Sequence, residues 1–222
     1  MITTSPVARW TWNSTSVTGD ETADCVGAAL SVLYVLGANR LSGPVRRISV
    51  EVGRYGAPRS PLHSGVFELQ GNVLEDNARR VVEEVRAGTP RGPVGTVVTR
   101  LQCPGRWYDA AGAERREARM FDCGVLATDT FVAVDLAAYG DCWLPHDLTG
   151  RPQPEIHRAN APRLAAALDG VAVLLRDPTE PDAPTRYGVP TPTGVGNLLG
   201  PDGTPDDVRS RFSGAASAAY CG

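Results

Sequence analysis

The chain has 222 residues, of which 42% are hydrophobic and 21% are charged, as in an ordinary soluble globular protein. Its formal net charge is −3, so we expect no nucleic-acid binding, because phosphate recognition needs clustered cations. All 22 basic residues are arginines, which excludes chemistry that needs a lysine amine, such as Schiff-base formation. The complete loss of lysine, with much Ala, Gly, Pro and Val, indicates a GC-rich genome.

The sequence predicts a cytoplasmic protein without a membrane segment. Its N-terminus lacks a cationic start followed by an apolar core, so no signal peptide is expected. The longest apolar run, residues 26–38, is too short to cross a bilayer and predicts a buried helix. The five cysteines are odd in number and widely spaced, with no Cys-x-x-Cys motif. This pattern argues against a disulfide framework or a structural zinc and favours a reducing compartment.

The first elements of the chain alternate between strand and helix patterns. Residues 9–17 are rich in aromatic and β-branched side chains and predict a strand. Asp20 or Thr22 can cap an uncharged, buried helix that ends at Gly37. Residues 45–54 alternate apolar and polar side chains, which is typical of an antiparallel strand with one exposed face.

A second helix follows a loop and a short strand. Pro58 and Pro61 predict the loop, and residues 65–69 predict the strand. Asn72 then caps an amphipathic helix that carries Glu75 at the capping-box position. Three further strands are predicted at residues 94–102, 117–126 and 130–137, with a hairpin turn at residues 109–112.

The order of these elements up to residue 102 is β-α-β-β-α-β, as in the ferredoxin-like split βαβ arrangement. We therefore predict an α+β fold, with a mainly antiparallel sheet and two to three helices packed on one of its faces. A hairpin at residues 106–137 would extend this sheet. Residues 1–176 would form one globular domain.

The C-terminal part is predicted as a helix followed by an extension. Asn160 is the expected N-cap of the helix, with Pro162 in its first turn. Gly170 weakens the helical pattern, so residues 171–175 are predicted as helix, with a short strand as the alternative. Residues 177–222 predict a Pro/Gly-rich extension that lies on the domain or is flexible.

No catalytic or cofactor motif is found. His146, Asp147, Glu155 and His157 are close in sequence, but the prolines among them give no regular metal-ligand spacing, so no metal site is expected. Cysteine catalysis would pair Cys142 with one of these histidines, which Pro145 disfavours. Ser64 follows His63 without a nucleophile motif, and the glycines at residues 194–196 precede no helix. We therefore predict no catalytic residue and no cofactor.

The residues of greatest interest gather in the segment 141–169, where an aromatic residue stands among charged ones on a Pro-rich bend. Trp and Arg are enriched where interface energy concentrates. We predict a protein-binding surface there, formed by Trp143, His146, Asp147, Arg151, His157 and Arg158. A second patch at the hairpin contains Trp107 and Tyr108, flanked by Arg106 and Asp109. The alternative is that Trp143 is an internal support beneath the bend.

Two functional hypotheses follow. The first is a non-catalytic bacterial cytoplasmic domain that binds another protein, in its most concrete form an immunity protein that blocks a toxin. The second is a small enzyme or ligand-binding protein of bacterial secondary metabolism, in which Asp147, Glu155 and His157 act as acid–base groups. The sequence favours the first hypothesis and gives no oligomeric state.

Overall fold

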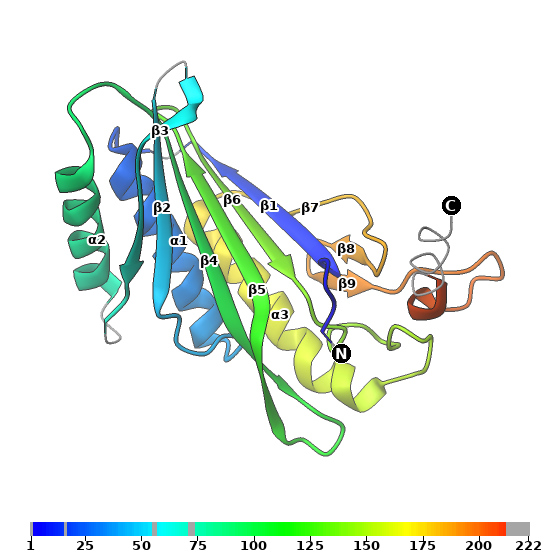
Figure 1. Ribbon diagram of the computed structural model, residues 1–222. Coiled ribbons are helices and arrows are strands. Elements are labelled where there is room, and N and C mark those ends of the chain that lie inside the picture. Colours follow the sequence, from blue (N-terminus) through cyan, green and yellow to red (C-terminus); the bar gives the residue numbers. More distant parts are fainter. Residues whose placement is uncertain (1, 16, 55–56, 71–73, 212–222) are drawn as a thin grey trace, which may run out of the picture.

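The computed structural model describes residues 2–15, 17–54, 57–70 and 74–211. The fold is α+β and is built on a seven-stranded antiparallel sheet in the order β3-β2-β4-β5-β6-β1-β7 (Figure 1). The strands are β1 (Ala8–Ser14), β2 (Arg47–Arg54), β3 (Ala57–Glu68), β4 (Val94–Tyr108), β5 (Glu114–Ala127), β6 (Val132–Ala138), β7 (Glu180–Pro181), β8 (Val189–Thr191) and β9 (Gly194–Gly196). The helices are α1 (Glu21–Ala38), α2 (Leu74–Gly88) and α3 (Pro154–Leu175), with a further helical turn at residues 208–211.

Side chains alternate across the sheet and divide it into two faces. Trp10 and Trp12 of β1, Val97 and Leu101 of β4, and Val134 of β6 are buried, and α1 and α3 lie on that side (Figure 1). The side chains between them in sequence point to the opposite face, which no helix of the described residues covers. We call this second surface the open face. Antiparallel sheets commonly leave one face to solvent in this way.

Helix α1 forms the centre of the core. The Asp20 side chain accepts a hydrogen bond from the Ala23 N–H (3.1 Å), which confirms the predicted cap. The helix packs across β4 and β5, where the Cys25 Sγ lies 3.3 Å from the Val97 carbonyl oxygen. Among the described helices, α1 has the length and apolar composition that could span a membrane, and eight of its residues are buried in this fold.

The ferredoxin-like arrangement is not confirmed. The linear order β-α-β-β-α-β is present, but β1 pairs with β6 and β7 rather than joining the β2–β4 group. The hairpins that link β4, β5 and β6 fill the space between β4 and β1. The predicted extra hairpin is therefore the middle of the sheet and not an addition to its edge.

Strand β3 corrects the loop that was predicted at Pro58 and Pro61. Both prolines lie within this 12-residue strand, which pairs with β2 along one side and forms an edge of the sheet. A proline lacks the N–H that a central strand needs, but an edge strand tolerates it on its free side. The pairing of β2 with β3 shifts register at Val52 and Gly53, next to this proline-containing part.

Helix α3 begins earlier than predicted. Pro154 occupies its first turn, and Pro162 lies inside the helix, where the carbonyl of Arg158 loses its usual N–H donor. Asn160 is not the N-cap: it is fully buried and its side chain bonds to the backbone of Tyr108. The helix continues to Leu175, so the helical prediction for residues 171–175 is confirmed.

Residues 177–211 fold back onto the sheet and helices. The indole N–H of Trp10 donates to the Thr191 carbonyl (2.8 Å), and that of Trp12 donates to Thr179 Oγ1 (3.1 Å). Strand β7 adds to the edge at β1, and β8 and β9 form a separate hairpin beside it (Figure 1). Asn72, the predicted cap of α2, and Cys221, one of the five cysteines, lie outside the described residues.

Candidate functional site

Trp143 lies beneath the bend and not on its surface. Its side chain is 0% exposed, and its ring packs against Phe121 with a centroid distance of 5.7 Å. Within the described part of the chain its indole N–H has no hydrogen-bond acceptor. Trp143 therefore cannot serve as an exposed binding anchor, and the internal-support alternative describes its position.

Asp147 shapes the bend. Its Oδ1 accepts hydrogen bonds from the Thr149 N–H (2.8 Å), the Thr149 hydroxyl (2.7 Å) and the Arg151 N–H (3.0 Å). Partial burial acts to raise the pKa of Asp147, but these hydrogen bonds outweigh it and hold the pKa below its ordinary value of 3.8. The carboxylate is thus a structural group of the turn, while the Arg151 side chain projects from it, exposed.

Two amide side chains fix the rest of the bend. Gln153 Nε2 donates to the carbonyl oxygens of Asp141 (2.7 Å) and Leu144 (2.9 Å). Asn197, from the C-terminal extension, accepts from the His146 N–H (3.0 Å) and donates to its carbonyl (2.8 Å). The backbone at His146 is therefore held by a residue 51 positions away in sequence.

A surface cleft of about 680 Å³ lies between this bend, the first half of α3 and the β8–β9 turn. Three of the predicted binding residues, His146, His157 and Arg158, are brought together at its wall. The remaining wall is apolar apart from one threonine and contains four prolines. Its residues are Pro145, Pro152, Pro154, Ala161, Pro162, Ala165 and Thr193.

The charged and titratable groups of the cleft are few. Partial burial lowers the pKa of His157 below its ordinary value of 6.5, which favours a neutral imidazole near neutral pH. Arg158 forms an exposed ion pair with Glu155 (2.7 Å), one turn earlier on α3. Asp147 and Glu155 are not among the residues that line the cleft, so the predicted acid–base set does not converge there.

The second predicted patch, with Trp107 and Tyr108 at the β4–β5 hairpin, is attached to α3 through Tyr108. Asn160 accepts from the Tyr108 N–H and donates to the Tyr108 carbonyl, both at 2.8 Å. The Arg163 guanidinium lies over the Tyr108 ring, 4.7 Å from its centroid. Trp107 and Tyr108 are both half-buried, and neither lines the cleft. The two predicted patches are thus connected through α3 but do not form one surface.

The described cysteines are not nucleophiles. Cys25, Cys103, Cys123 and Cys142 are buried and unpaired. Desolvation raises the pKa of all four thiols, that of Cys25 and Cys103 to about 12, so the thiolate form is suppressed at neutral pH. Across residues 2–15, 17–54, 57–70 and 74–211, no three His, Cys, Asp or Glu side chains gather in a group that could hold a metal ion.

Part of the cleft was not predicted from the sequence: its wall includes Ala161, Pro162 and Ala165 of α3 and Thr193 of the β8–β9 turn. The sequence predicted Pro162 in a helix start and residues 177–222 as an extension, and it singled out none of Ala161, Ala165 and Thr193. The many prolines in segments 145–162 and 178–205 were the available signal for this cleft.

Comparison with known proteins found no matching family model, no matching curated protein and no matching solved structure.

Proposed function

We propose that this chain is a non-catalytic, cytoplasmic protein-binding domain, and that the cleft beside His146 and His157 receives an apolar segment of one partner protein. The observation that carries the proposal is the make-up of this cleft. Its wall is formed by prolines and alanines, with two histidines and one arginine among them. An apolar centre with a few polar groups and Arg is the usual anatomy of a protein interface.

The rigidity of the wall favours binding. Proline and alanine side chains lose almost no conformational entropy when a partner covers them. The backbone behind them is also fixed, by Gln153 within the bend and by Asn197 from the extension. An acidic residue flanking the apolar segment of the partner would face Arg158 at the margin of the cleft.

An immunity protein is the concrete form of this proposal. Such a protein must present a stable surface and needs no chemistry of its own. The four described cysteines are buried, the Asp147 carboxylate is held by hydrogen bonds within the bend, and the Glu155 carboxylate forms an ion pair with Arg158. The acid–base alternative therefore has less support than the binding surface.

The test uses the product of the neighbouring gene as the candidate partner in isothermal titration calorimetry. Ala165→Arg places a long charged side chain in the cleft and should weaken binding by at least about a hundredfold, the effect of a disrupted interface hot spot. Ala166→Arg is the matched control, because Ala166 is the adjacent exposed residue of α3 and does not line the cleft.

The two variants separate the possible results. Loss of binding in Ala165→Arg with unchanged binding in Ala166→Arg would support the cleft. Equal affinities for both variants would overturn its assignment. If the neighbouring gene product is toxic in cells and this chain does not restore growth, the immunity form of the proposal is wrong.

A further inference from the structure

A second groove lies on the open face of the sheet. It shares no lining residue with the cleft beside His146. Its volume is about 650 Å³, and its wall comes from β2, β3, β4 and β5 and from the residues just before β2. Half of its wall is polar and half is apolar. The polar residues are Arg46, Arg47, Ser49, Arg100 and Gln102, and the apolar residues are Pro44, Val45, Val66, Pro104 and Ala118.

The strand register explains why these side chains meet. Ser49 of β2 is directly opposite Arg100 of β4 on one side and Val66 of β3 on the other. Directly opposed residues of antiparallel strands place their side chains on the same face, about 5 Å apart. Ser49, Arg100 and Val66 therefore form one row across the groove.

The arginine side chains of this groove have few partners among the described residues. Arg47 forms an ion pair with Glu68 (3.4 Å), in which both side chains are largely exposed. In the described ranges, no carboxylate lies within ion-pair distance of Arg46 or Arg100. Arg100 is also exposed, and the Ser49 hydroxyl donates to its backbone carbonyl (3.1 Å) and not to its guanidinium.

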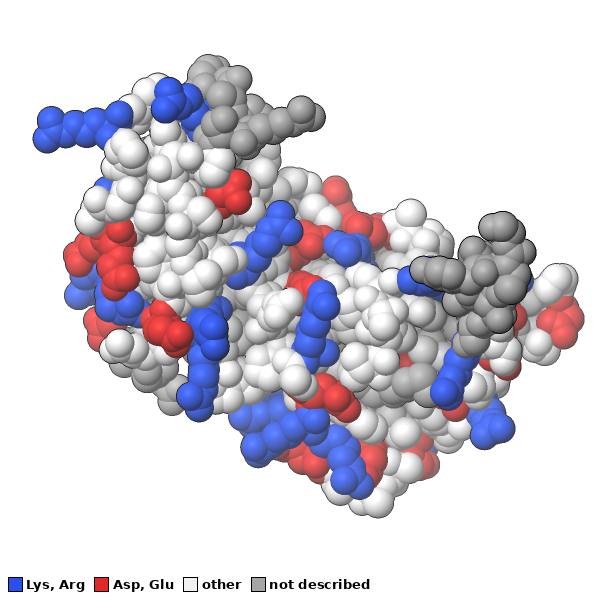
Figure 2. Space-filling view, in the orientation of Figure 1, with Lys and Arg blue, Asp and Glu red and all other residues white. Residues whose placement is uncertain are grey.

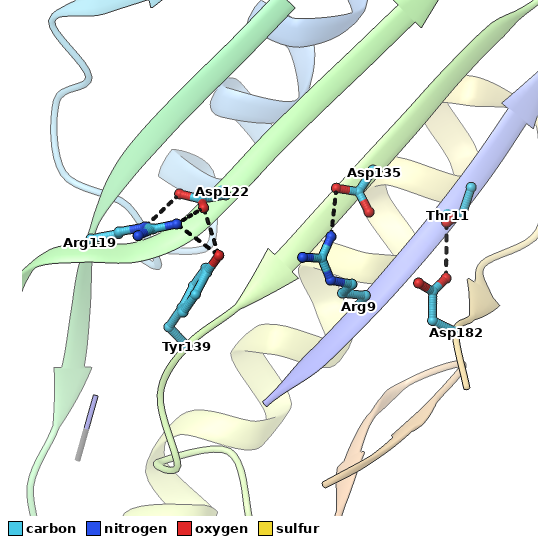
Figure 3. A network of polar contacts seen from close by, with 7 residues as sticks. All are labelled: Arg9, Thr11, Arg119, Asp122, Asp135, Tyr139 and Asp182. Atoms are coloured by element: carbon cyan, nitrogen blue, oxygen red, sulfur yellow. Dashed lines mark hydrogen bonds and ion pairs between the residues drawn. The ribbon is translucent and has the colours of Figure 1, made fainter. Parts of the chain in front are cut away.

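The neighbouring part of the open face is different, as Figure 3 shows. There Arg9 pairs with Asp135 (3.5 Å), and Arg119 binds both Asp122 and the Tyr139 hydroxyl. Each of these arginines is neutralised by a carboxylate of the same sheet. Figure 2 shows this face, on which arginine and acidic side chains are interspersed. The groove at Arg46 and Arg100 thus carries positive charge that no carboxylate of the described residues pairs with.

We propose that this groove binds an acidic peptide segment of a partner protein, with its carboxylates on Arg46 and Arg100 and its apolar side chains against Val45, Val66 and Pro104. Guanidinium groups match carboxylates through paired N–H donors. The apolar half of the wall would make no favourable contact with a free inorganic anion. It can pack against apolar side chains that stand between the acidic residues of a peptide. This surface is independent of the cleft beside His146.

The experiment measures fluorescence anisotropy of a short labelled peptide of alternating Glu and Val on the full chain, at low salt. We expect saturable binding that weakens as salt is added. The double variant Arg46→Gln/Arg100→Gln should raise the Kd by at least about tenfold, equivalent to 1.4 kcal/mol. Arg79→Gln/Arg91→Gln is the matched control, because it removes the same two charges from exposed positions outside the groove.

A control peptide and two competing anions identify the class of ligand. The same peptide with Gln in place of Glu should not bind, and inorganic phosphate or a single-stranded oligonucleotide should compete no better than free glutamate. No saturable binding, or equal loss in Arg79→Gln/Arg91→Gln and Arg46→Gln/Arg100→Gln, would overturn the proposal. Stronger binding of phosphate or the oligonucleotide would overturn it as well. Ala165→Arg should leave peptide binding unchanged, so failure here is distinct from failure at the cleft.

Discussion

Asn197 and His146 are joined by two hydrogen bonds, in which the side-chain amide of Asn197 binds both backbone polar groups of His146. The same two-bond bridge occurs between Asn160 and Tyr108 and between Asn77 and Gln70. In each case the asparagine side chain bonds as a neighbouring strand would and satisfies both backbone polar groups of one residue. The bridge at His146 is the one that connects the C-terminal extension to the cleft.

Replacement of Asn197 should loosen the cleft. Asn197→Ala leaves the N–H and carbonyl of His146 without these partners, and we expect a loss of about 1–3 kcal/mol in the free energy of unfolding. The amide hydrogen of His146 should also exchange faster, which mass spectrometry or NMR can measure. Asn197→Asp is the control, because it keeps the acceptor for the His146 N–H but loses the donor to the His146 carbonyl. The exchange rate of the His146 amide in this variant should lie between those of the parent and of Asn197→Ala. Unchanged protection in Asn197→Ala would show that the bridge does not hold the bend.

Trp143 should be a determinant of stability. Trp143→Ala removes a side chain that is fully buried against Phe121, and cavities of this kind cost about 3–5 kcal/mol. Trp143→Phe keeps an aromatic ring and removes the unpartnered indole N–H, so its loss should be clearly smaller. Urea unfolding of the three proteins gives these differences. If Trp143→Ala unfolds at the same urea concentration as the parent, the indole does not occupy the core.

Local patterns predicted those elements whose cause is local. The Asp20 cap, the alternation of β2 and the apolar stripe of α2 depend on neighbouring residues, and each was predicted from sequence. Asn160 followed by Pro162 is equally typical of a helix start, but tertiary contact decides there. Asn160 bonds to Tyr108, 52 residues away, and the helix runs past it without a break.

The extension and the cleft depend on still longer separations. Trp10 meets Thr191 at a separation of 181 residues, and nothing in the composition of the extension points to that contact. The sequence placed His146, His157 and Arg158 on one binding surface because they are close along the chain. The structure brings those three to one cleft, but other parts of its wall come from later residues of α3 and from the β8–β9 turn. Neither the burial of Trp143 nor the position of Thr193 in the wall of the cleft can be predicted from the spacing of nearby residues.

The described cysteines should be unreactive until the protein unfolds. Desolvation raises the pKa of Cys25 and Cys103 to about 12 and also raises the pKa of Cys123 and Cys142, so little thiolate is present at pH 8. Incubation of the native protein with iodoacetamide, followed by peptide mass spectrometry, should leave these four thiols unmodified. In urea all four should react. Rapid labelling of any of them in the native protein would contradict its buried position.

The pH dependence of stability should contain a contribution from His157. Its folded-state pKa lies below 6.5 because partial burial disfavours the imidazolium, so the unfolded chain takes up the proton first as the pH falls. The contribution is therefore present above about pH 6.5 and is lost as the pH falls from that value through the folded-state pKa. NMR titration of the His157 ring in the native protein should give a midpoint below that of the same residue in urea. The urea midpoint of the parent should also fall more than that of His157→Gln between pH 7.5 and 5.5. If the urea midpoints of the two proteins change equally over this range, the burial of His157 does not affect its titration.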